Sequence, residues 1–440
     1  MSKYRDLNSD LVARVSARKN EPTWMLEIRQ QALETFFELG LPTWGPNLSN
    51  LDFSEINYYI EPESEVKHTW EEVPEKIKQT FEKLGLPEQE AKFFSGVADQ
   101  FESTMAYNHL DDDLKKQGAI FLDTDSALQQ HPEIFKKYFS SLIPATDNKF
   151  AALNTALWSG GAFVYIPKGV VLEQPLQSYF RMESRGMGQF ERTLIIVEDN
   201  GNLDYLEGCT APLYSKNSLH CGVVEIFVGE NARCRYSTVQ NWSENVYNLV
   251  TKRAICQKNA QMSWVDGNIG SAVTMKYPAV ILSGEGATGS MLSISTAGVN
   301  QDQDSGAKMI HLASNTSSSI MSKSIAHDGG IATYRGLVKI SKDVKNCRAQ
   351  INCDNLILDN KSVVNSFPEN YSIGTTNILE NEASISRVND AQLLYLQSRG
   401  LSKEDAYNLI VLGFVDDFLQ ALPMEYSIEL QQLLKMELVD

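Results

Sequence analysis

The thiol of Cys209 is the side chain of this sequence best placed for covalent chemistry. It lies in the segment Tyr205–Pro212, between a strand-like run and a turn, directly after Gly208 and shortly before the proline that ends the segment. A thiol in that setting can meet a reagent, and Arg181 or Arg192 would stabilise its thiolate if stacked strands brought them close. A buried structural thiol is the alternative, and the residues alone leave both open.

The remaining cysteines and the histidines have no spacing typical of a metal site. The six cysteines include no Cys-x-x-Cys pair and the six histidines no His-x-x-x-His pair, so we expect neither a zinc site nor a disulfide framework. Cysteines on strands are usually small buried hydrophobic residues. We expect this of five of them: Cys221, Cys234, Cys256, Cys347 and Cys353.

A nucleotide site is not indicated either. The segment Gly284–Gly289 matches the Gly-x-Gly-x-x-Gly pattern of dinucleotide sites. Because the run after it alternates like a strand, it cannot supply the helix N-terminus that such a site needs. The sequence also lacks the Gly-x-x-x-x-Gly-Lys-Ser/Thr loop that binds nucleotide phosphates. We therefore expect a protein that is not itself an enzyme with ATPase activity, and any ATP would be used by a partner.

Two carboxylates near the end of the strand-rich region form a second candidate site. Glu380 and Glu382 are two positions apart, so their side chains point to the same face of an extended chain. Like charges placed together often mark a metal site or a proton-handling site. An exposed acidic edge is the plainer alternative.

Composition excludes several classes of partner. The chain of 440 residues carries a formal charge of -17, which argues against nucleic acid because binding to phosphates needs clustered Lys and Arg. Its start is polar, and no uninterrupted apolar run approaches the roughly 20 residues that span a bilayer. We expect a cytoplasmic protein without membrane contact.

The order of local patterns predicts three regions. Residues 1–155 are mainly helical, with one helix that starts after Asn20 and ends at Gly40, and another from about Pro74 to Leu84. Residues 156–385 consist of short alternating runs typical of strands. Residues 386–440 return to a helical pattern, which we interpret as a helical domain: a cap on the end of the strand-rich region or a docking module for another protein.

A repeat in the strand-rich region predicts the fold class, mainly β. Segments that start at Asn200, Asn231 and Asn259 share the pattern Asn, small, any, apolar, any, aromatic, at offsets of 31 and 28 residues. A turn residue followed by alternating side chains at this period is typical of stacked coils, so we predict a parallel β-helix, that is a solenoid. An antiparallel sandwich is the alternative. The Ser-rich stretch Ser314–Ser324 fits a linker by composition, but its interleaved apolar residues favour a coil.

Several stretches in the same order resemble one known family, the SufB scaffold subunits of the SUF system, which assembles iron–sulfur clusters. The stretches are Glu21–Met25, Phe190–Ile196, Tyr205–Pro212, Tyr236–Trp242, Asn248–Arg253, Lys308–His311, Tyr334–Val338 and Leu422–Pro423. The resemblance implies a right-handed parallel β-helix flanked by helical N-terminal and C-terminal regions. It also implies a SufBCD complex: pairing with SufD or as a homodimer through the β-helices, and a SufC ATPase on the C-terminal domain.

The resemblance also implies roles for single residues. Cys209 matches the cysteine that accepts persulfide sulfur from a cysteine desulfurase and its sulfur-transfer partner. Arg181, Gln240, Trp242 and Lys252 match residues of an internal sulfur route. Glu380 and Glu382 match carboxylates beside the place where iron joins the sulfur, so the cofactor implied is a transient iron–sulfur cluster, with a reduced flavin in some relatives.

Two positions depart from the family pattern and keep a second interpretation open. Ser372 stands where some members have a second cysteine, and Asn381 stands where a histidine is common. Both are weaker iron ligands than thiolate or imidazole, so a structural subunit similar to SufD, which never ligates the cluster, is the alternative. A secreted carbohydrate-active β-helix enzyme is a third class, but the chain shows no signal segment.

Overall fold

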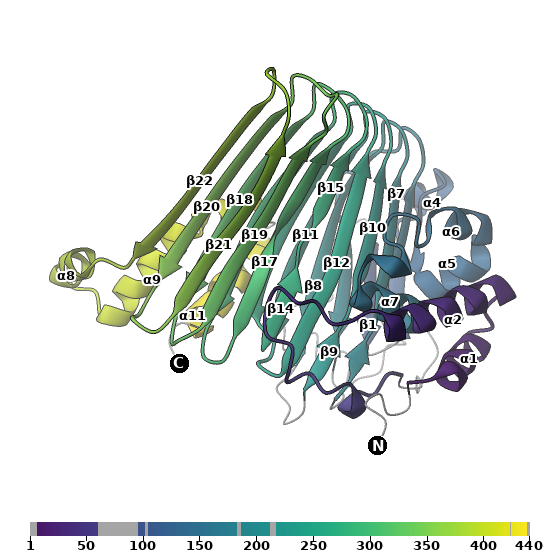
Figure 1. Cartoon of the computed structure of the whole chain (residues 1–440), viewed down its shortest axis with the longest axis horizontal. Helices are drawn as coiled ribbons and strands as arrows, with labels where there is room; N and C mark the ends of the chain where they lie inside the picture. The colour runs from purple at the N-terminus through teal and green to yellow at the C-terminus, as the bar shows by residue number, and fades with distance from the viewer. Residues whose placement is uncertain are drawn as a thin grey trace.

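A computed structural model describes residues 7–59, 96–101, 104–182, 186–211, 217–422 and 424–437. The molecule is mainly β: a parallel β-solenoid of about seven turns with helices at both ends of the chain (Figure 1). This confirms the predicted fold class and excludes the sandwich. The Ser-rich stretch lies in a coil, because strand β18 spans Ser317–Ala326.

Two sheets form the walls of the solenoid. One has ten strands in the order β2-β1-β5-β8-β11-β13-β16-β18-β20-β22, so that neighbouring strands come from successive turns. Its strands are β1 Gly96–Phe101, β2 Thr104–Leu110, β5 Leu176–Arg181, β8 Asn202–Thr210, β11 Arg233–Trp242, β13 Gln261–Gly270, β16 Thr288–Ala297, β18 Ser317–Ala326, β20 Arg348–Ile357 and β22 Ile378–Arg387.

The second sheet has twelve strands and runs β21-β19-β17-β14-β12-β10-β7-β4-β3, with three short strands off this path. Its strands are β3 Ile120–Asp123, β4 Ala162–Ile166, β6 Gly188–Gln189, β7 Arg192–Val197, β9 Ser218–His220, β10 Val223–Val228, β12 Val246–Cys256, β14 Val273–Lys276, β15 Ala279–Leu282, β17 Asp302–His311, β19 Ile331–Ile340 and β21 Val363–Ser372. Each turn therefore contributes one row of side chains from each wall.

The repeated asparagines form the turns between the two sheets. Asn200, Asn231 and Asn259 have φ angles of 58°, 55° and 55°, a left-handed conformation that asparagine tolerates better than most residues. The amides also stack from turn to turn, since Asn259 Nδ2 donates to Asn231 Oδ1 at 3.0 Å. The sequence repeat therefore reflects a backbone requirement of each coil.

Helices of the N-terminal part cover the twelve-stranded sheet, except for the short helix Asp112–Lys116, whose Leu114 packs in the interior cluster with Leu203. They are α1 Ser9–Arg18, α2 Thr23–Glu38, α4 Asp112–Lys116, α5 Thr124–Gln130, α6 Pro132–Tyr138 and α7 Lys149–Leu157, with 3-10 turns at Phe53–Glu55 and Ala145–Asp147. Phe36 of α2 and Leu153 of α7 are buried in one cluster with Leu249 of the sheet. The helix expected after Asn20 is confirmed as α2, whereas the one expected near residues 74–84 lies outside the described residues.

The first 155 residues also supply strands, which the helical prediction missed. β1 pairs with β5 in parallel, β2 adds to β1 in antiparallel orientation, and β3 pairs with β4 in antiparallel orientation. These strands extend both sheets beyond the first coil. The reason is tertiary: a short strand gains its hydrogen bonds from the free edge that the solenoid offers.

Helices of the C-terminal part cover the outer face of the ten-stranded sheet. They are α8 Asp390–Ser398, α9 Lys403–Phe414, α10 Asp416–Ala421 and α11 Met424–Glu437. Phe418 of α10 packs in one buried cluster with Val265 and Ile294 of the sheet. Ser402 caps α9 as its sequence predicts, accepting a hydrogen bond from the Asp405 amide at 3.0 Å. Helix α8 stands away from the solenoid body (Figure 1).

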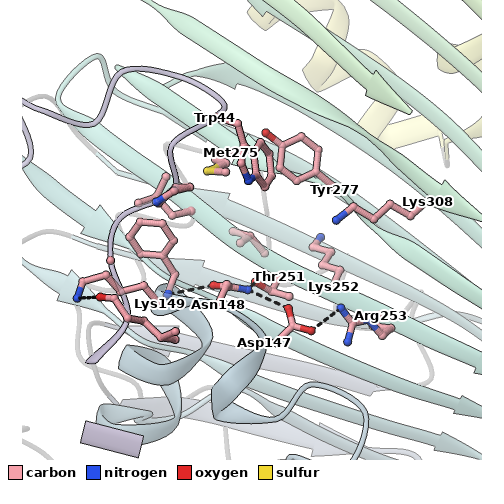
Figure 2. Close-up of a pocket in the computed structure, with 16 residues that line it drawn as sticks. Trp44, Asp147, Asn148, Lys149, Thr251, Lys252, Arg253, Met275, Tyr277 and Lys308 are labelled. Carbon is pink, nitrogen blue, oxygen red and sulfur yellow. Dashed lines mark hydrogen bonds and ion pairs between the residues drawn. The ribbon is translucent and has the colours of Figure 1, made fainter. Parts of the chain in front are cut away.

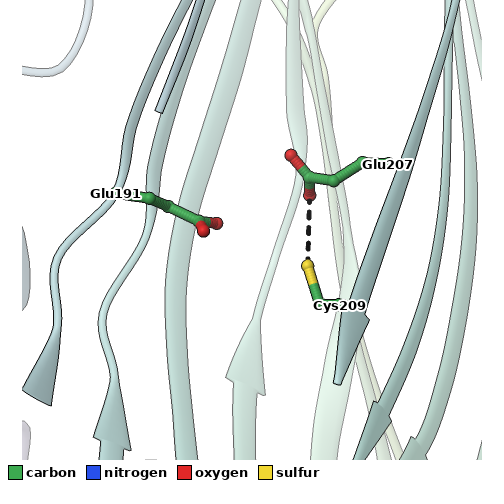
Figure 3. A group of neighbouring side chains, drawn as sticks. All are labelled: Glu191, Glu207 and Cys209. Carbon is green, nitrogen blue, oxygen red and sulfur yellow. Dashed lines mark hydrogen bonds between the residues drawn. The ribbon is translucent and has the colours of Figure 1, made fainter. Parts of the chain in front are cut away.

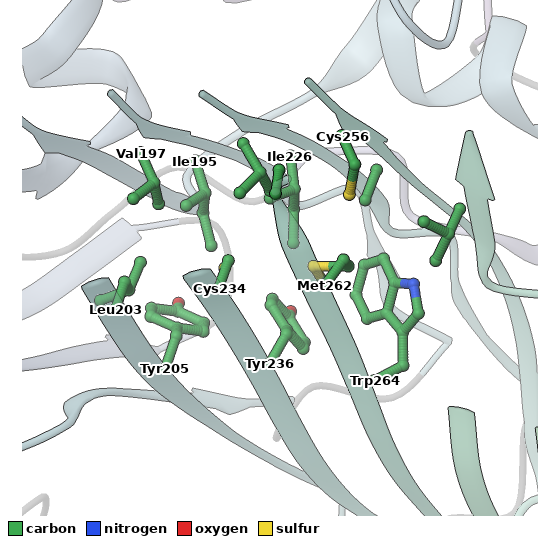
Figure 4. Close-up of a cluster of buried hydrophobic side chains, with 14 of the residues drawn as sticks. Ile195, Val197, Leu203, Tyr205, Ile226, Cys234, Tyr236, Cys256, Met262 and Trp264 are labelled. Carbon is green, nitrogen blue, oxygen red and sulfur yellow. The ribbon is translucent and has the colours of Figure 1, made fainter. Parts of the chain in front are cut away.

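The solenoid interior is apolar over one half of its width. Figure 4 shows Leu203, Tyr205, Tyr236 and Trp264 of the ten-stranded sheet facing aliphatic side chains of the other sheet. Cys234 and Cys256 lie in this cluster as buried thiols, as predicted for strand cysteines. Fully burying a side chain of this kind stabilises the fold by roughly 2 to 3 kcal/mol, so this half holds successive coils together.

Candidate functional site

The other half of the interior is polar, and Cys209 lies in it. Alternation along β8 sends Leu203, Tyr205, Glu207 and Cys209 to the inside. The first two residues enter the apolar cluster, and the last two continue beyond it. The same strand therefore contributes to the core and to the site.

Cys209 is enclosed, with an exposed fraction of only 2%. Its Sγ lies 3.9 Å from Glu207 Oε1 and 3.9 Å from Gln240 Nε2. Glu191 approaches from the opposite wall, and single ligand atoms of Glu191, Glu207 and Cys209 all lie within 4.8 Å of one another (Figure 3). The remaining side is apolar and includes Trp242. The thiol thus lies at the border between a hydrophobic cluster and an ionisable one.

Two buried lysines connect Glu207 to the next coils. Lys252 Nζ lies 3.8 Å from Glu207 Oε1 and 3.5 Å from Asp266 Oδ1. Lys276 Nζ lies 2.8 Å from Asp266 Oδ2 and 3.0 Å from Gln240 Oε1. The structure therefore brings Gln240, Trp242 and Lys252 of the predicted sulfur route together around Cys209.

His220 joins this network on the side of Glu191. Its Nδ1 lies 2.8 Å from Asn248 Oδ1, and its Nε2 lies 3.0 Å from Glu191 Oε1. The imidazole also lies against Trp242, with ring centroids 4.6 Å apart. Sequence analysis missed His220, Glu191 and Glu207. Only Glu207 had a local signal, since it is two positions from Cys209 and therefore on the same face of the strand.

Burial and the two glutamates keep the Cys209 thiol protonated. Burial raises the pKa of Cys209 well above its ordinary value, and the charges of Glu207 and Glu191 raise it further, against the opposing effect of Lys252 and Lys276. Burial also raises the pKa of Glu207 and lowers the pKa of Lys276 to about 8. Burial opposes ionisation of Asp266, but Lys276 and Lys252 together lower the pKa of that carboxyl.

The two arginines proposed as neighbours of the thiol behave differently. Arg181 lies one strand away from Cys209, where its backbone pairs with Thr210, and its side chain is outside the described part of the structure. Arg192 points to the outer face, where its guanidinium donates to Glu225 Oε2 at 2.6 Å. The expectation that Arg192 could stabilise a Cys209 thiolate is therefore wrong, because strand alternation sends its side chain away from the interior.

The carboxylates of the second candidate site lie far from Cys209. Glu380 and Glu382 pair in register with Gln350 and Asn352 on β20, and both side chains are exposed. Strand β22 is six strands from β8, or about 29 Å at the usual spacing. Between the two glutamates, Asn381 pairs with the buried Ile351, so it belongs to the inward row.

A row of polar side chains runs from Cys209 through the interior toward the open end of the solenoid and stops at Asn355, whose partner on β22 is Ile385. Parallel register aligns six positions, one in each successive strand: Cys209, Gln240, Asn268, Ser295, Ser324 and Asn355. All six are buried, and Ser295 and Ser324 are hydrogen-bonded at 3.3 Å. The polar row thus runs from Cys209 to Asn355 on β20, in the coil before the open end of the solenoid. Ser372 lies at that open end, on β21 of the other sheet.

A separate cavity of about 290 Å³ lies outside the solenoid, between the N-terminal segment and the twelve-stranded sheet (Figure 2). Trp44 and Tyr277 form one side, and an ion pair of 2.8 Å between Arg253 and Asp147 forms the other. No cysteine lines it. Lys252, which contacts Glu207 in the interior, also lines this cavity, so the two sites meet at the strand that carries Lys252.

Comparison with known proteins accounts for nearly the whole chain. Residues 2–178 match the family described as SufBD protein N-terminal region, and residues 180–414 match SUF system FeS cluster assembly, SufBD core domain. The chain belongs to the SufBD family of iron–sulfur cluster assembly proteins, which confirms the resemblance found in the sequence.

Curated relatives match over the same length. The chain is 54% identical to the iron–sulfur cluster assembly protein SufB of Bacillus subtilis (strain 168) over 434 residues, 99% of this chain and 93% of the relative. It is 52% identical to an iron–sulfur cluster assembly SufBD family protein of Staphylococcus aureus (strain MRSA252), with the same coverage. None of the helices among the described residues has the length and hydrophobicity that a transmembrane span requires.

Proposed function

We propose that this chain is a cytoplasmic scaffold on which iron–sulfur clusters are built, and that Cys209 accepts the sulfur. The observation that carries the proposal is a buried thiol in an ionisable environment, in register with a polar row that leads toward the open end of the solenoid. Purely structural thiols, such as Cys234 and Cys256, lie instead among hydrophobic side chains.

The sulfur-transfer step needs the thiolate of Cys209. The thiolate attacks the outer sulfur of a donor persulfide, a new S–S bond forms on Cys209, and the donor's S–S bond breaks to leave the donor thiolate. No net oxidation occurs, and the proton of Cys209 passes to a base. Because the pKa of the thiol is raised in the closed structure, we infer that the donor complex loosens the two glutamates from Cys209 or brings Lys252 nearer.

The polar row supports passage of sulfur toward the end of the solenoid. Gln240 and Lys252 offer hydrogen-bond donors and a positive charge beside Cys209, which stabilise anionic sulfur, and Trp242 with Arg181 completes the proposed start of the route. The serines and asparagines beyond them offer further donors. In this proposal, iron meets sulfur beside Glu380 and Glu382.

The end of the solenoid supports pairing with another subunit. Strands β21 and β22 are the last strands of their sheets, so each leaves one backbone edge unpaired. Ile385 on β22 is 58% exposed although its register partner Asn355 is buried, and Ile373 directly after β21 is 65% exposed. A SufD subunit or a second copy of this chain would cover this edge and add ligands for the cluster.

The C-terminal helices support docking of a SufC ATPase. Leu409 on α9 and Leu394 on α8 are exposed hydrophobic residues on helices whose other faces are partly buried. ATP binding to the partner would then favour one arrangement of the complex over another, a population shift transmitted through these helices. Loss of ATPase co-purification in Leu409→Glu, with SufD pairing retained, tests this docking face without uncovering the sheet.

The decisive experiment compares two buried cysteines. With a cysteine desulfurase and its sulfur-transfer partner as donors, Cys209→Ala is expected to abolish persulfide labelling of the purified complex, and Cys234→Ala to retain it. Both variants should keep the subunit composition. Unchanged labelling of Cys209→Ala would refute the acceptor role.

A structural role similar to that of SufD is the second candidate function. It is favoured by Ser372 and Asn381, which place weak iron donors at the open end. Anaerobic reconstitution with iron and sulfide, followed by visible absorption, separates the two roles. A chromophore lost in the double variant Glu380→Gln/Glu382→Gln supports the scaffold, whereas no chromophore in any subunit combination supports the structural role.

A further inference from the structure

The surroundings of Cys209 include a set of metal-ligand atoms that sulfur transfer alone does not need. One carboxylate oxygen each of Glu191 and Glu207 and the Sγ of Cys209 lie within 4.8 Å of one another (Figure 3). Ligands of a tetrahedral ion bound at 2.0 to 2.3 Å are about 3.5 Å apart. Side-chain rotations that move each ligand atom by roughly 1 Å would therefore bring all three atoms within bonding distance of one ion.

Four buried atoms beside this set have no hydrogen-bond partner among the described residues: Oε2 of Glu191, Nε2 of His220, Nε1 of Trp242 and Nζ of Lys252. Glu191 is 1% exposed and His220 is fully buried, so water does not replace the missing partners at the surface. Figure 3 shows the Glu191 carboxylate directed toward Glu207 and Cys209. A buried carboxylate oxygen without a donor points to a cation.

The orientation of His220 supports the same conclusion. Its Nδ1 faces the amide of Asn248, which itself donates from Nδ2 to Gln240 Oε1 at 2.8 Å, so Asn248 Oδ1 is the acceptor and Nδ1 the donor. In the neutral imidazole, Nε2 then carries a lone pair and faces Glu191 Oε1 at 3.0 Å. A lone pair and a carboxylate at this distance repel each other unless a proton or a metal ion lies between them. An Nδ1 hydrogen bond that fixes Nε2 as donor atom is also the usual arrangement of metal-binding histidines.

The ionisable groups of the interior include more acids than bases, which favours binding of a cation. Among the described side chains of this polar cluster, Glu191, Glu207 and Asp266 are acids and Lys252 and Lys276 are bases. With the Cys209 thiol protonated, three carboxylates against two ammonium groups leave a charge of minus one, which becomes minus two when a metal ion replaces the thiol proton. A divalent ion neutralises it, and burying uncompensated charge is costly.

We propose that Glu191, Glu207, Cys209 and His220 form an interior binding site for a divalent transition-metal ion with mixed sulfur, nitrogen and oxygen ligands, iron(II) being the cargo. This inference rests on the proposed function for the identity of the metal. Binding replaces the proton of Cys209: a sulfur–metal bond forms, the S–H bond breaks, and the proton leaves to solvent, with no change in oxidation state. Iron would then first meet the chain beside the sulfur acceptor, before the open end of the solenoid.

Cobalt(II) is the probe of choice, because a thiolate ligand gives it an intense charge-transfer band in the near ultraviolet. The SUF complex is purified, reduced, freed of metal and incubated anaerobically with cobalt(II), and bound cobalt is also counted by elemental analysis. We expect one ion per chain with the thiolate band in the parent protein. The band should vanish in Cys209→Ala, and affinity should fall at least about tenfold in Glu191→Gln or Glu207→Gln.

Matched controls separate loss of the metal site from loss of the folded structure. Cys256→Ala removes a buried thiol from the apolar half and should keep both the band and the stoichiometry, while circular dichroism checks that every variant is folded. A parent protein without the band, a band that survives in Cys209→Ala, or undiminished affinity in a folded Glu191→Gln overturns the site.

Persulfide labelling of the same samples keeps the two proposals apart. Normal labelling of Cys209 in a protein that binds no cobalt overturns the metal site alone. Cobalt binding through Cys209 in a protein that accepts no persulfide overturns the acceptor role alone.

Discussion

The two halves of the solenoid interior are built from the same strands but differ in what they do. On β8, Tyr205 enters an apolar cluster while Cys209, four positions on, enters a network of acids and lysines. The same contrast holds for thiols, because Cys234 and Cys256 are surrounded by hydrophobic side chains. Position along the strand, which sets the neighbours in every other turn, therefore separates stability from chemistry.

The largest expected effect is a decrease in the free energy of unfolding when a large side chain of the apolar half is removed. Trp264 is 1% exposed and lies next to Tyr236, with ring centroids 5.2 Å apart. Trp264→Ala should lower the free energy of unfolding by about 4 kcal/mol, because it removes a large buried side chain and leaves a cavity. Urea unfolding measures this. Cys209→Ala serves as the matched variant of the polar half, and an equal loss there would contradict the division of roles.

A smaller, pH-dependent effect is expected from the polar half. Burial lowers the pKa of Lys276 to about 8 in the folded chain, from 10.5. Above pH 8 the folded state has released this proton while the unfolded state still holds it, so the Lys276 contribution to stability rises with pH until about 10.5. Lys276→Met lacks this contribution.

The difference in unfolding free energy between the parent protein and Lys276→Met should therefore increase on going from pH 7 to pH 10. The full change is on the order of 3 kcal/mol. Using the difference cancels the ionisation of the buried thiols, which both proteins share. A difference that stays constant with pH would show that Lys276 is charged to the same extent in both states.

The smallest effect concerns the reactivity of single thiols. The charge of Glu207 contributes to the raised pKa of Cys209, after burial, whereas Cys234 owes its raised pKa chiefly to burial. Glu207→Gln should therefore accelerate alkylation of Cys209 by a few-fold at pH 8 and leave Cys234 unchanged. Peptide mapping after timed alkylation gives both rates from one sample. Equal acceleration of both thiols would indicate general loosening of the coil.

Much of this architecture can be predicted from the sequence because one period governs it. The offsets of 31 and 28 residues that relate Asn200, Asn231 and Asn259 also relate Cys209 to Gln240 and Gln240 to Asn268. Once the turn residues are recognised, adding the same offsets to position 209 predicts the first positions of the polar row. The alternation in β8 likewise predicts that Glu207 and Cys209 share a face.

The rest of the site depends on contacts that no local pattern contains. Glu191 precedes the short β7, and His220 ends the three-residue β9, where the repeat is interrupted. Their approach to Cys209 is decided by pairing across the two walls. Strand β3 has only four residues and exists because β4 offers it an edge. The direction of Arg192 was mistaken for the same reason, since it depends on which face of β7 is inside.

Each coil adds one strand to each sheet, so the length of the solenoid changes only by whole interstrand spacings. Deleting a single residue within a strand would exchange its inner and outer side chains, whereas deleting one whole turn, from β17 to β18, would keep every remaining row in phase. Such a shortened chain would hold Cys209 closer to the open end by one interstrand spacing, about 4.8 Å. The distance between Cys209 and the open end of the solenoid can therefore change only by whole coils.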